Sequence, residues 1–299
     1  MIEQFWWLYD LIAVVAVILC IYLSARKGIF KSAITLIGCI IGILISVPMS
    51  SAVSESIYKT VVRDNNVKTL DKSLGEVEIS VYLASALEKL DYNVIVNSAK
   101  LDEILESEKD TDEQIYKYLN NINGKKVDNE ENFRDNLNIA YAEVIKNIFS
   151  KDIGSYALET ASYKIRSGKK DAGNLIKMMK NGENRKKVAE IIADDYINDA
   201  YITVIRLVAY TAFFAIIFII GILTANSLSG SQRDVDVGTG SRVAGGICGA
   251  VTGVAVVFII AVLVRLYVVM GSNENLFFDT KTIDKMYIFR YAYDIAYKL

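Results

Sequence analysis

The chain has 299 residues, 53% of them hydrophobic, and its 33 basic and 35 acidic side chains leave a net charge of −2. It contains no histidine, which excludes a Ser-His-Asp triad, a Cys-His catalytic pair and any histidine-bound metal. The charge balance gives no reason to expect a nucleic-acid partner. Because nucleotide-binding glycine loops and an EF-hand are also missing, we expect neither an enzyme nor a metal or cofactor site.

Four long apolar segments decide the class of the protein. They lie in two pairs near the two ends of the chain, at 5–23, 30–49, 202–227 and 243–270. Each is long enough to cross a hydrocarbon layer of about 30 Å at about 1.5 Å per residue. By direct count, 27 of the 35 acidic and 22 of the 33 basic residues lie between positions 50 and 200. We therefore predict an all-α membrane protein with four transmembrane helices in two hairpins and a large helical insertion in water.

The same pattern sets the predicted domains. These are a first transmembrane hairpin (1–49), a helical insertion (50–200), a second transmembrane hairpin (201–271) and an amphipathic tail (272–299). Apolar residues of the tail share one helix face, at Tyr287, Tyr291 and Ile295. The tail is therefore expected to lie on the membrane surface or to pack against the insertion.

A basic turn between the first two apolar segments predicts the orientation. Its residues are Arg26, Lys27, Gly28 and Lys31. Short loops rich in lysine and arginine stay in the cytoplasm. We therefore expect a multi-pass protein of the cell membrane in which residues 50–200 are extracytoplasmic.

Within the insertion, apolar residues recur with the helical period. The pattern predicts helices at 81–90, 101–105, near 116–119, 133–149, 153–165 and 175–179. The segment 183–201 is predicted to continue into the third apolar segment as one helix. The composition of residues 100–132, rich in lysine, glutamate and asparagine, predicts loose order there.

Three charged residues fall inside apolar segments: Asp10, Arg206 and Arg265. A charge within the membrane costs a few kcal/mol and usually has a partner. Because Asp10 and Arg206 both lie near the outer side, we expect a structural ion pair, with Arg265 as the other candidate partner, or a carboxylate close to the membrane interface. The alternative is an ion or proton relay.

Glycines recur at intervals of four in two of the apolar segments. They are Gly38 and Gly42 in the second segment and Gly245, Gly249 and Gly253 in the fourth. Residues four apart share one helix face, and the missing side chains let another backbone come close. We expect tight packing within the four-helix unit, or alternatively a face for a second copy or a membrane partner.

Short motifs in both hairpins carry a family resemblance. The first hairpin has Asp10, the basic turn 26–31, Leu36-Ile37-Gly38 and Ile40-Ile41-Gly42. The second has Leu228-Ser229-Gly230, Ser241-Arg242-Val243-Ala244-Gly245, Gly249 and Gly253. In these residues the chain resembles the colicin V production protein family, known as CvpA. The resemblance implies a membrane factor that supports production or export of a peptide toxin, a bacteriocin, as a non-catalytic scaffold.

The chain also departs from that family. The insertion has no counterpart in compact members, and Thr252 stands where a basic residue is common. Two other functions stay open: a small ion or solute transporter or channel that uses Asp10 and Arg206, and a membrane-anchored module whose insertion binds an envelope partner. The expected partners are the lipid bilayer and a membrane or envelope protein, with a homo-oligomer as a further option and no nucleic acid.

Overall fold

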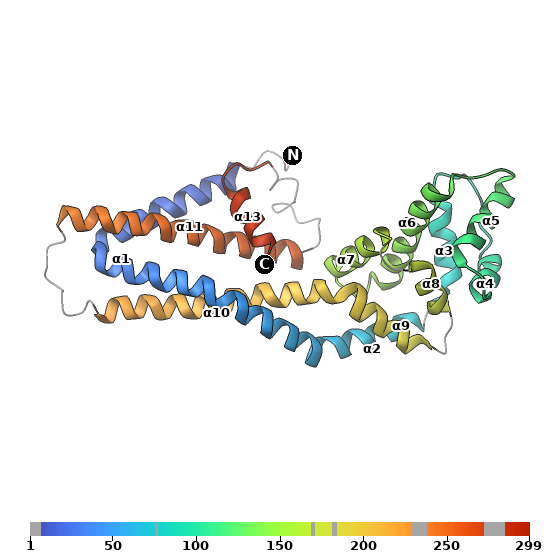
Figure 1. Ribbon diagram of the computed structural model, residues 1–299, viewed down its shortest axis with the longest axis horizontal. Helices are drawn as coiled ribbons and strands as arrows, with labels where there is room; N and C mark the ends of the chain where they lie inside the picture. The colour runs from blue at the N-terminus through green and yellow to red at the C-terminus, as the bar shows by residue number, and fades with distance from the viewer. Residues whose placement is uncertain (1–6, 76, 169–170, 181–183, 229–237, 272–284) are drawn as a thin grey trace. The chain divides into compact units, whose positions relative to one another are not determined.

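The computed structural model describes residues 7–75, 77–168, 171–180, 184–228, 238–271 and 285–299. Throughout these ranges the regular secondary structure is helical, so the all-α prediction is confirmed. The chain divides into two compact units. The membrane unit combines the residues up to Ile57 with those from Ile202 onwards, and the insertion unit is Tyr58–Tyr201 (Figure 1).

Four helices make up the described part of the membrane unit: α1 (Trp7–Ile57), α10 (Asn198–Leu228), α11 (Thr239–Met270) and α13 (Phe289–Tyr297). Within α1, Gly28 has φ 75° and ψ 173°, so two helical arms meet there (Figure 1). Glycine adopts this backbone conformation readily because it has no Cβ atom. Helix α1 continues through Pro48 to Ile57, eight residues beyond the predicted end of the first hairpin at position 49.

Three described helices are long and apolar enough to cross a membrane: Trp7–Leu74, Arg185–Leu228 and Thr239–Met270. The sequence predicts four spans. The numbers differ because the two apolar arms that meet at the kink at Gly28 are counted together within Trp7–Leu74. The predicted continuation of residues 183–201 into the third apolar segment is confirmed over Arg185–Leu228.

The repeated glycines lie where helices of the membrane unit meet. A Cβ atom on Gly249 would stand 2.5 Å from the carbonyl oxygen of Cys20, and one on Gly253 would stand 2.8 Å from Cα of Val17. Gly245 faces the backbone of Ser24 and Gly28 in the same way. The glycine face of α11 is therefore covered by the first arm of α1, which leaves no room there for a second copy.

The second arm of α1 packs on α10 through its own glycines. A Cβ atom on Gly38 would lie 2.9 Å from Cα of Gly221, so the two backbones are in direct contact. Gly42 faces the ring of Phe214, at 3.2 Å from the position of its missing Cβ atom. Each arm of α1 thus has a different helix as its neighbour.

The insertion unit is built from short helices. They are α2 (Arg63–Leu74), α3 (Ile79–Glu88), α4 (Ser98–Glu106), α5 (Thr111–Asn123), α6 (Glu130–Phe149), α7 (Ser155–Arg166), α8 (Ala172–Lys180) and α9 (Arg185–Ile191), with π-helical turns at Tyr58–Val62 and Ile192–Ile197. Helix α6 supplies the centre of one apolar core, with Leu137, Tyr141 and Phe149 fully buried. The stripe predicted on this helix is buried along its whole length.

The prediction of loose order at residues 100–132 is wrong. Helices α4 and α5 cover much of this stretch, and Ile115 and Leu119 are fully buried. The Asp110 side chain accepts a hydrogen bond from the backbone N–H of Glu113, 2.8 Å away, which caps the start of α5. Gly124 ends the helix at φ 71°. A few well-spaced apolar residues therefore outweigh the polar composition.

Both ends of the insertion unit are tied to each other. The Tyr58 hydroxyl donates to the Ala193 carbonyl over 2.5 Å. The Arg63 guanidinium binds the Asp194 carboxylate through two hydrogen bonds of 2.7 and 2.6 Å. The chain therefore enters and leaves this unit at one place.

Candidate functional site

Helix α13 is the element around which charged residues of the membrane unit gather. It packs on α11 and α1 with one apolar face, formed by Phe289, Tyr293 and Ala296. These positions are four and three residues apart, the spacing of a helix face. The Phe289 ring lies 5.4 Å from the Tyr9 ring, measured between centroids. The predicted tail thus contains a helix packed within the membrane unit, but through a different face from the one predicted, since Tyr287, Tyr291 and Ile295 are exposed. Residues 272–284 of that tail lie outside the described residues.

Asp10 binds the N-terminal end of α13. One carboxylate oxygen accepts a hydrogen bond from the Tyr287 N–H at 2.9 Å, and the other accepts from Ile288 at 2.9 Å and Phe289 at 2.8 Å. The first N–H groups of a helix have no partner inside the helix. The residue at the capping position, Ile288, has no side-chain acceptor to offer. Asp10 therefore caps α13 from another helix, and its negative charge suits the positive end of the helix dipole.

Arg265 and Arg206 bind the C-terminal end of the same helix. The Arg265 side chain donates to the Ala296 carbonyl, and its guanidinium lies 4.8 Å from the centre of the Tyr297 ring. Arg206 donates to the Leu299 carbonyl over 2.8 Å. Cations near a helix C-terminus interact favourably with its dipole and with its unpaired carbonyls.

We call Asp10, Arg206 and Arg265 the α13 clamp. All three were singled out in the sequence as charges within apolar segments. Among the described residues, however, Asp10 forms an ion pair with neither arginine and binds backbone N–H groups of α13 instead. Instead of forming the expected ion pair, the three charged residues bind the two ends of α13. The sequence shows the helical apolar stripe of the tail, but it does not show which backbone groups these charged residues bind.

The basic turn lies beside the start of α11. Arg26 and Lys27 are exposed, Lys31 is half-buried and Gly28 is buried. The Ile29 N–H donates to the Ser241 hydroxyl over 3.0 Å. The turn and the start of the α11 glycine series therefore form one packed corner.

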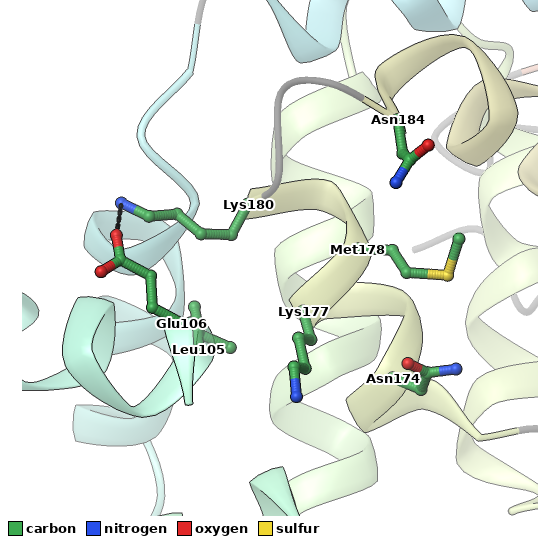
Figure 2. Close-up of a pocket in the computed structure, with 7 residues that line it drawn as sticks. All are labelled: Leu105, Glu106, Asn174, Lys177, Met178, Lys180 and Asn184. Atoms are coloured by element: carbon green, nitrogen blue, oxygen red, sulfur yellow. Dashed lines mark ion pairs between the residues drawn. The ribbon is translucent and has the colours of Figure 1, made fainter. Parts of the chain in front are cut away.

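The insertion unit contains a polar cavity of about 440 Å³ (Figure 2). It is lined by Leu105, Glu106, Asn174, Lys177, Met178, Lys180 and Asn184. Lys180 forms an ion pair with Asp102, which lowers the pKa of that carboxyl group, and its Nζ lies 4.0 Å from Glu106. Asp102 and Glu106 offset the charge of Lys180, so the cavity offers Lys177 and two asparagine side chains to a small polar ligand. No sequence motif marks this cavity.

A partly buried hydrogen bond joins α5 and α6 within the insertion unit. The Tyr141 hydroxyl donates to the Asp112 carboxylate over 2.7 Å, and Tyr141 is fully buried. Burial, followed by the nearby Asp112 charge, raises the pKa of Tyr141 well above its usual value. Burial is also the largest cause that raises the pKa of Asp112. The pair is a structural feature of the core that the sequence pattern did not reveal.

In comparison with known proteins, no family model, curated protein or solved structure matches the chain.

Proposed function

We propose that this chain is a non-catalytic membrane scaffold with four spans in two hairpins, which carries the insertion unit on the extracytoplasmic side. The arms of α1 before and after Gly28 support four spans, because each is apolar and long enough to cross a hydrocarbon layer of about 30 Å. The exposed Arg26 and Lys27 support a cytoplasmic position for the turn between them.

The observation that carries the scaffold proposal is the α13 clamp. A transporter or channel would need Asp10 and Arg206 to line a path for ions or polar solutes. Instead, these side chains bind backbone groups at the two ends of α13. Charges used in this way stabilise one arrangement of helices, which suits a scaffold.

Labelling of single cysteines tests the number of spans and the orientation. After alanine replaces the three native cysteines, a cysteine is placed at Lys27 or at Tyr163, both exposed. We expect a membrane-impermeant maleimide to label Tyr163→Cys in intact cells and Lys27→Cys only after permeabilisation. If both positions react from the same side, residues 29–57 do not cross the membrane and the four-span proposal fails.

The role in toxin production rests on the residues that resemble the CvpA family. The resembling residues of the basic turn lie beside the resembling residues of α11, since Gly28 contacts Gly245 and Ile29 binds Ser241. Quantitative proteomics of the culture medium, with and without the protein, tests this role. Selective loss of one small peptide is the expected result, and an unchanged set of exported peptides would exclude it.

A second candidate function is an interaction module whose insertion unit binds an envelope partner. The separate core of this unit and its polar cavity favour it. Lys177→Ala should weaken binding of an anionic partner, whereas Lys187→Ala, at an exposed lysine that does not line the cavity, should not. Crosslinking in intact cells provides the measurement, and equal crosslinking in both variants would remove the cavity from this role.

A further inference from the structure

The two arginines of the clamp have more donors than α13 satisfies. A guanidinium offers five N–H donors in a planar fork. Each arginine donates to one carbonyl at the end of α13. The Nε atoms of Arg206 and Arg265 are both buried without an acceptor, and Arg265 is only 5% exposed. Within the described ranges, no aspartate or glutamate side chain forms an ion pair with either arginine.

Two positive charges also meet at this end of α13. A helix C-terminus carries the equivalent of about half a negative charge. Two guanidinium groups meet it here, from α10 and α11. An anion with several oxygen atoms would satisfy the two unpaired Nε–H donors, which the backbone oxygens of α13 leave without an acceptor.

An apolar groove runs along the same helix. Its volume is about 660 Å³, and it lies between α13 and the mid-parts of α1 and α11. Val17, Ile40 and Phe258 line its inner side, and Tyr291 and Ile295 form its wall on α13. Such a groove accepts a hydrocarbon chain and offers nothing to a polar ligand.

We propose that Arg206 and Arg265 form a binding site for a phosphate group, and that the phosphate of an anionic lipid competes there with the last turn of α13. This inference rests on the proposed membrane scaffold. Arg265 lies five residues before the end of α11, so in the proposed membrane arrangement it lies near the lipid headgroups. The acyl chain then occupies the groove, so one lipid uses both features.

The proposal predicts where α13 loosens. Lipid phosphate draws the arginines away from the carbonyls of Ala296 and Leu299, whereas Asp10 keeps its three hydrogen bonds at the other end. The last turn, in which Lys298 and Leu299 donate to Ile295 and Ala296, therefore opens first. Loss of order is confined to that turn.

Hydrogen exchange of the full-length protein in lipid nanodiscs tests this. We expect amides of the last turn of α13 to exchange several-fold faster in phosphatidylglycerol than in phosphatidylcholine, with amides of the first turn unchanged. Equal rates in the two lipids, or an increase spread over all of α13, would overturn the proposal. Inorganic phosphate added to phosphatidylcholine discs separates the sources: faster exchange there assigns the site to free phosphate, and no change assigns it to the lipid.

Lipid retention, measured by native mass spectrometry, gives a second readout with a matched control. Arg206→Gln and Arg265→Gln should each lower retained phosphatidylglycerol several-fold. Arg290→Gln is the control, because Arg290 is an exposed arginine of α13 whose Nε lies 3.8 Å from Asp294. An equal loss in the control would show general charge attraction and refute a specific site. Since neither assay depends on exported peptides or on labelling from one side of the membrane, their failure is distinguishable from failure of the proposed function.

Discussion

At the scale of single residues, Asp10 does for α13 what a capping side chain usually does within its own helix. Asp10→Ala removes the acceptor of three hydrogen bonds. Loss of an N-cap costs about 0.5–2 kcal/mol, so we expect α13 to leave its place more often. A cysteine at the buried Tyr293 should then react faster with a maleimide. Asp294→Ala, an exposed carboxylate on α13, is the control, and equal rates in both variants would contradict the capping role.

Gly249 and Gly246 form a second matched pair. A Cβ atom on Gly249 would lie 2.5 Å from the Cys20 carbonyl oxygen and 2.9 Å from Cα of Ile21, whereas one on Gly246 meets side-chain carbons at 3.7 and 3.8 Å. Gly249→Ala should therefore lower stability by about 1–3 kcal/mol, the usual cost of overpacking. Gly246→Ala should be tolerated. Thermal unfolding in detergent measures both, and a stable Gly249→Ala variant would show that α11 can move away from α1.

At the scale of elements, the link between α5 and α6 predicts how the insertion unit responds to alkali. The pKa of the Tyr141 hydroxyl is raised in the folded state, so above about pH 10 the unfolded chain releases this proton while the folded chain keeps it. The contribution of Tyr141 to the free energy of unfolding is therefore fully present below about pH 10. Above that pH it falls, by up to about 1.4 kcal/mol per pH unit for one tyrosine.

Circular dichroism against pH, with tyrosinate absorbance recorded in parallel, measures this loss. Burial also raises the pKa of Tyr196 to about 12, which adds to the same trend. Tyr141→Phe should make the alkaline loss shallower. If the variant and the native protein lose structure with the same slope, Tyr141 is not the group responsible.

The polar cavity depends on the pairing of α4 with α8. Lys180 of α8 pairs with Asp102 of α4, and each side chain is about one-third exposed. Exposed pairs contribute about 0–1 kcal/mol, so Asp102→Asn should leave the fold intact. We expect that variant to unfold within a few degrees of the native protein, and a large drop in its melting temperature would mean that the pair organises α8.

At the scale of the whole chain, the insertion unit has what an independent domain needs. It has its own apolar core, and its two ends are joined by Tyr58, Arg63 and their partners. Residues 58–201 expressed alone should therefore fold into a helical, cooperatively unfolding domain. Leu137→Ala should destabilise it by about 2–5 kcal/mol. A fragment that shows no thermal transition would contradict this.

Much of the fold follows from apolar spacing. Helices α3 to α8 of the insertion unit appear close to where the period predicts them, because one buried face per helix is enough to place each of them, whereas α2 was not predicted. At residues 100–132 the polar composition led to a wrong prediction of loose order. The few apolar residues there, such as Ile115 and Leu119, are spaced so that they are fully buried. The partners of Asp10 could not be predicted from the sequence, for a different reason. They are backbone N–H groups 277 to 279 residues away, and backbone groups leave no mark in a sequence pattern.

The contacts of α1 have a consequence for the order in which the protein is made. Gly38 contacts Gly221, and Cys20 contacts Gly249. The partners of both arms of α1 are therefore synthesised roughly 200 residues after the arms themselves. Domains generally fold as units during synthesis, and the insertion unit completes its core in that interval. The nascent chain thus holds α1 in the bilayer with its glycine-rich faces still uncovered. Any membrane factor that assists biogenesis of this protein would have to act in that interval, before α10 and α11 arrive.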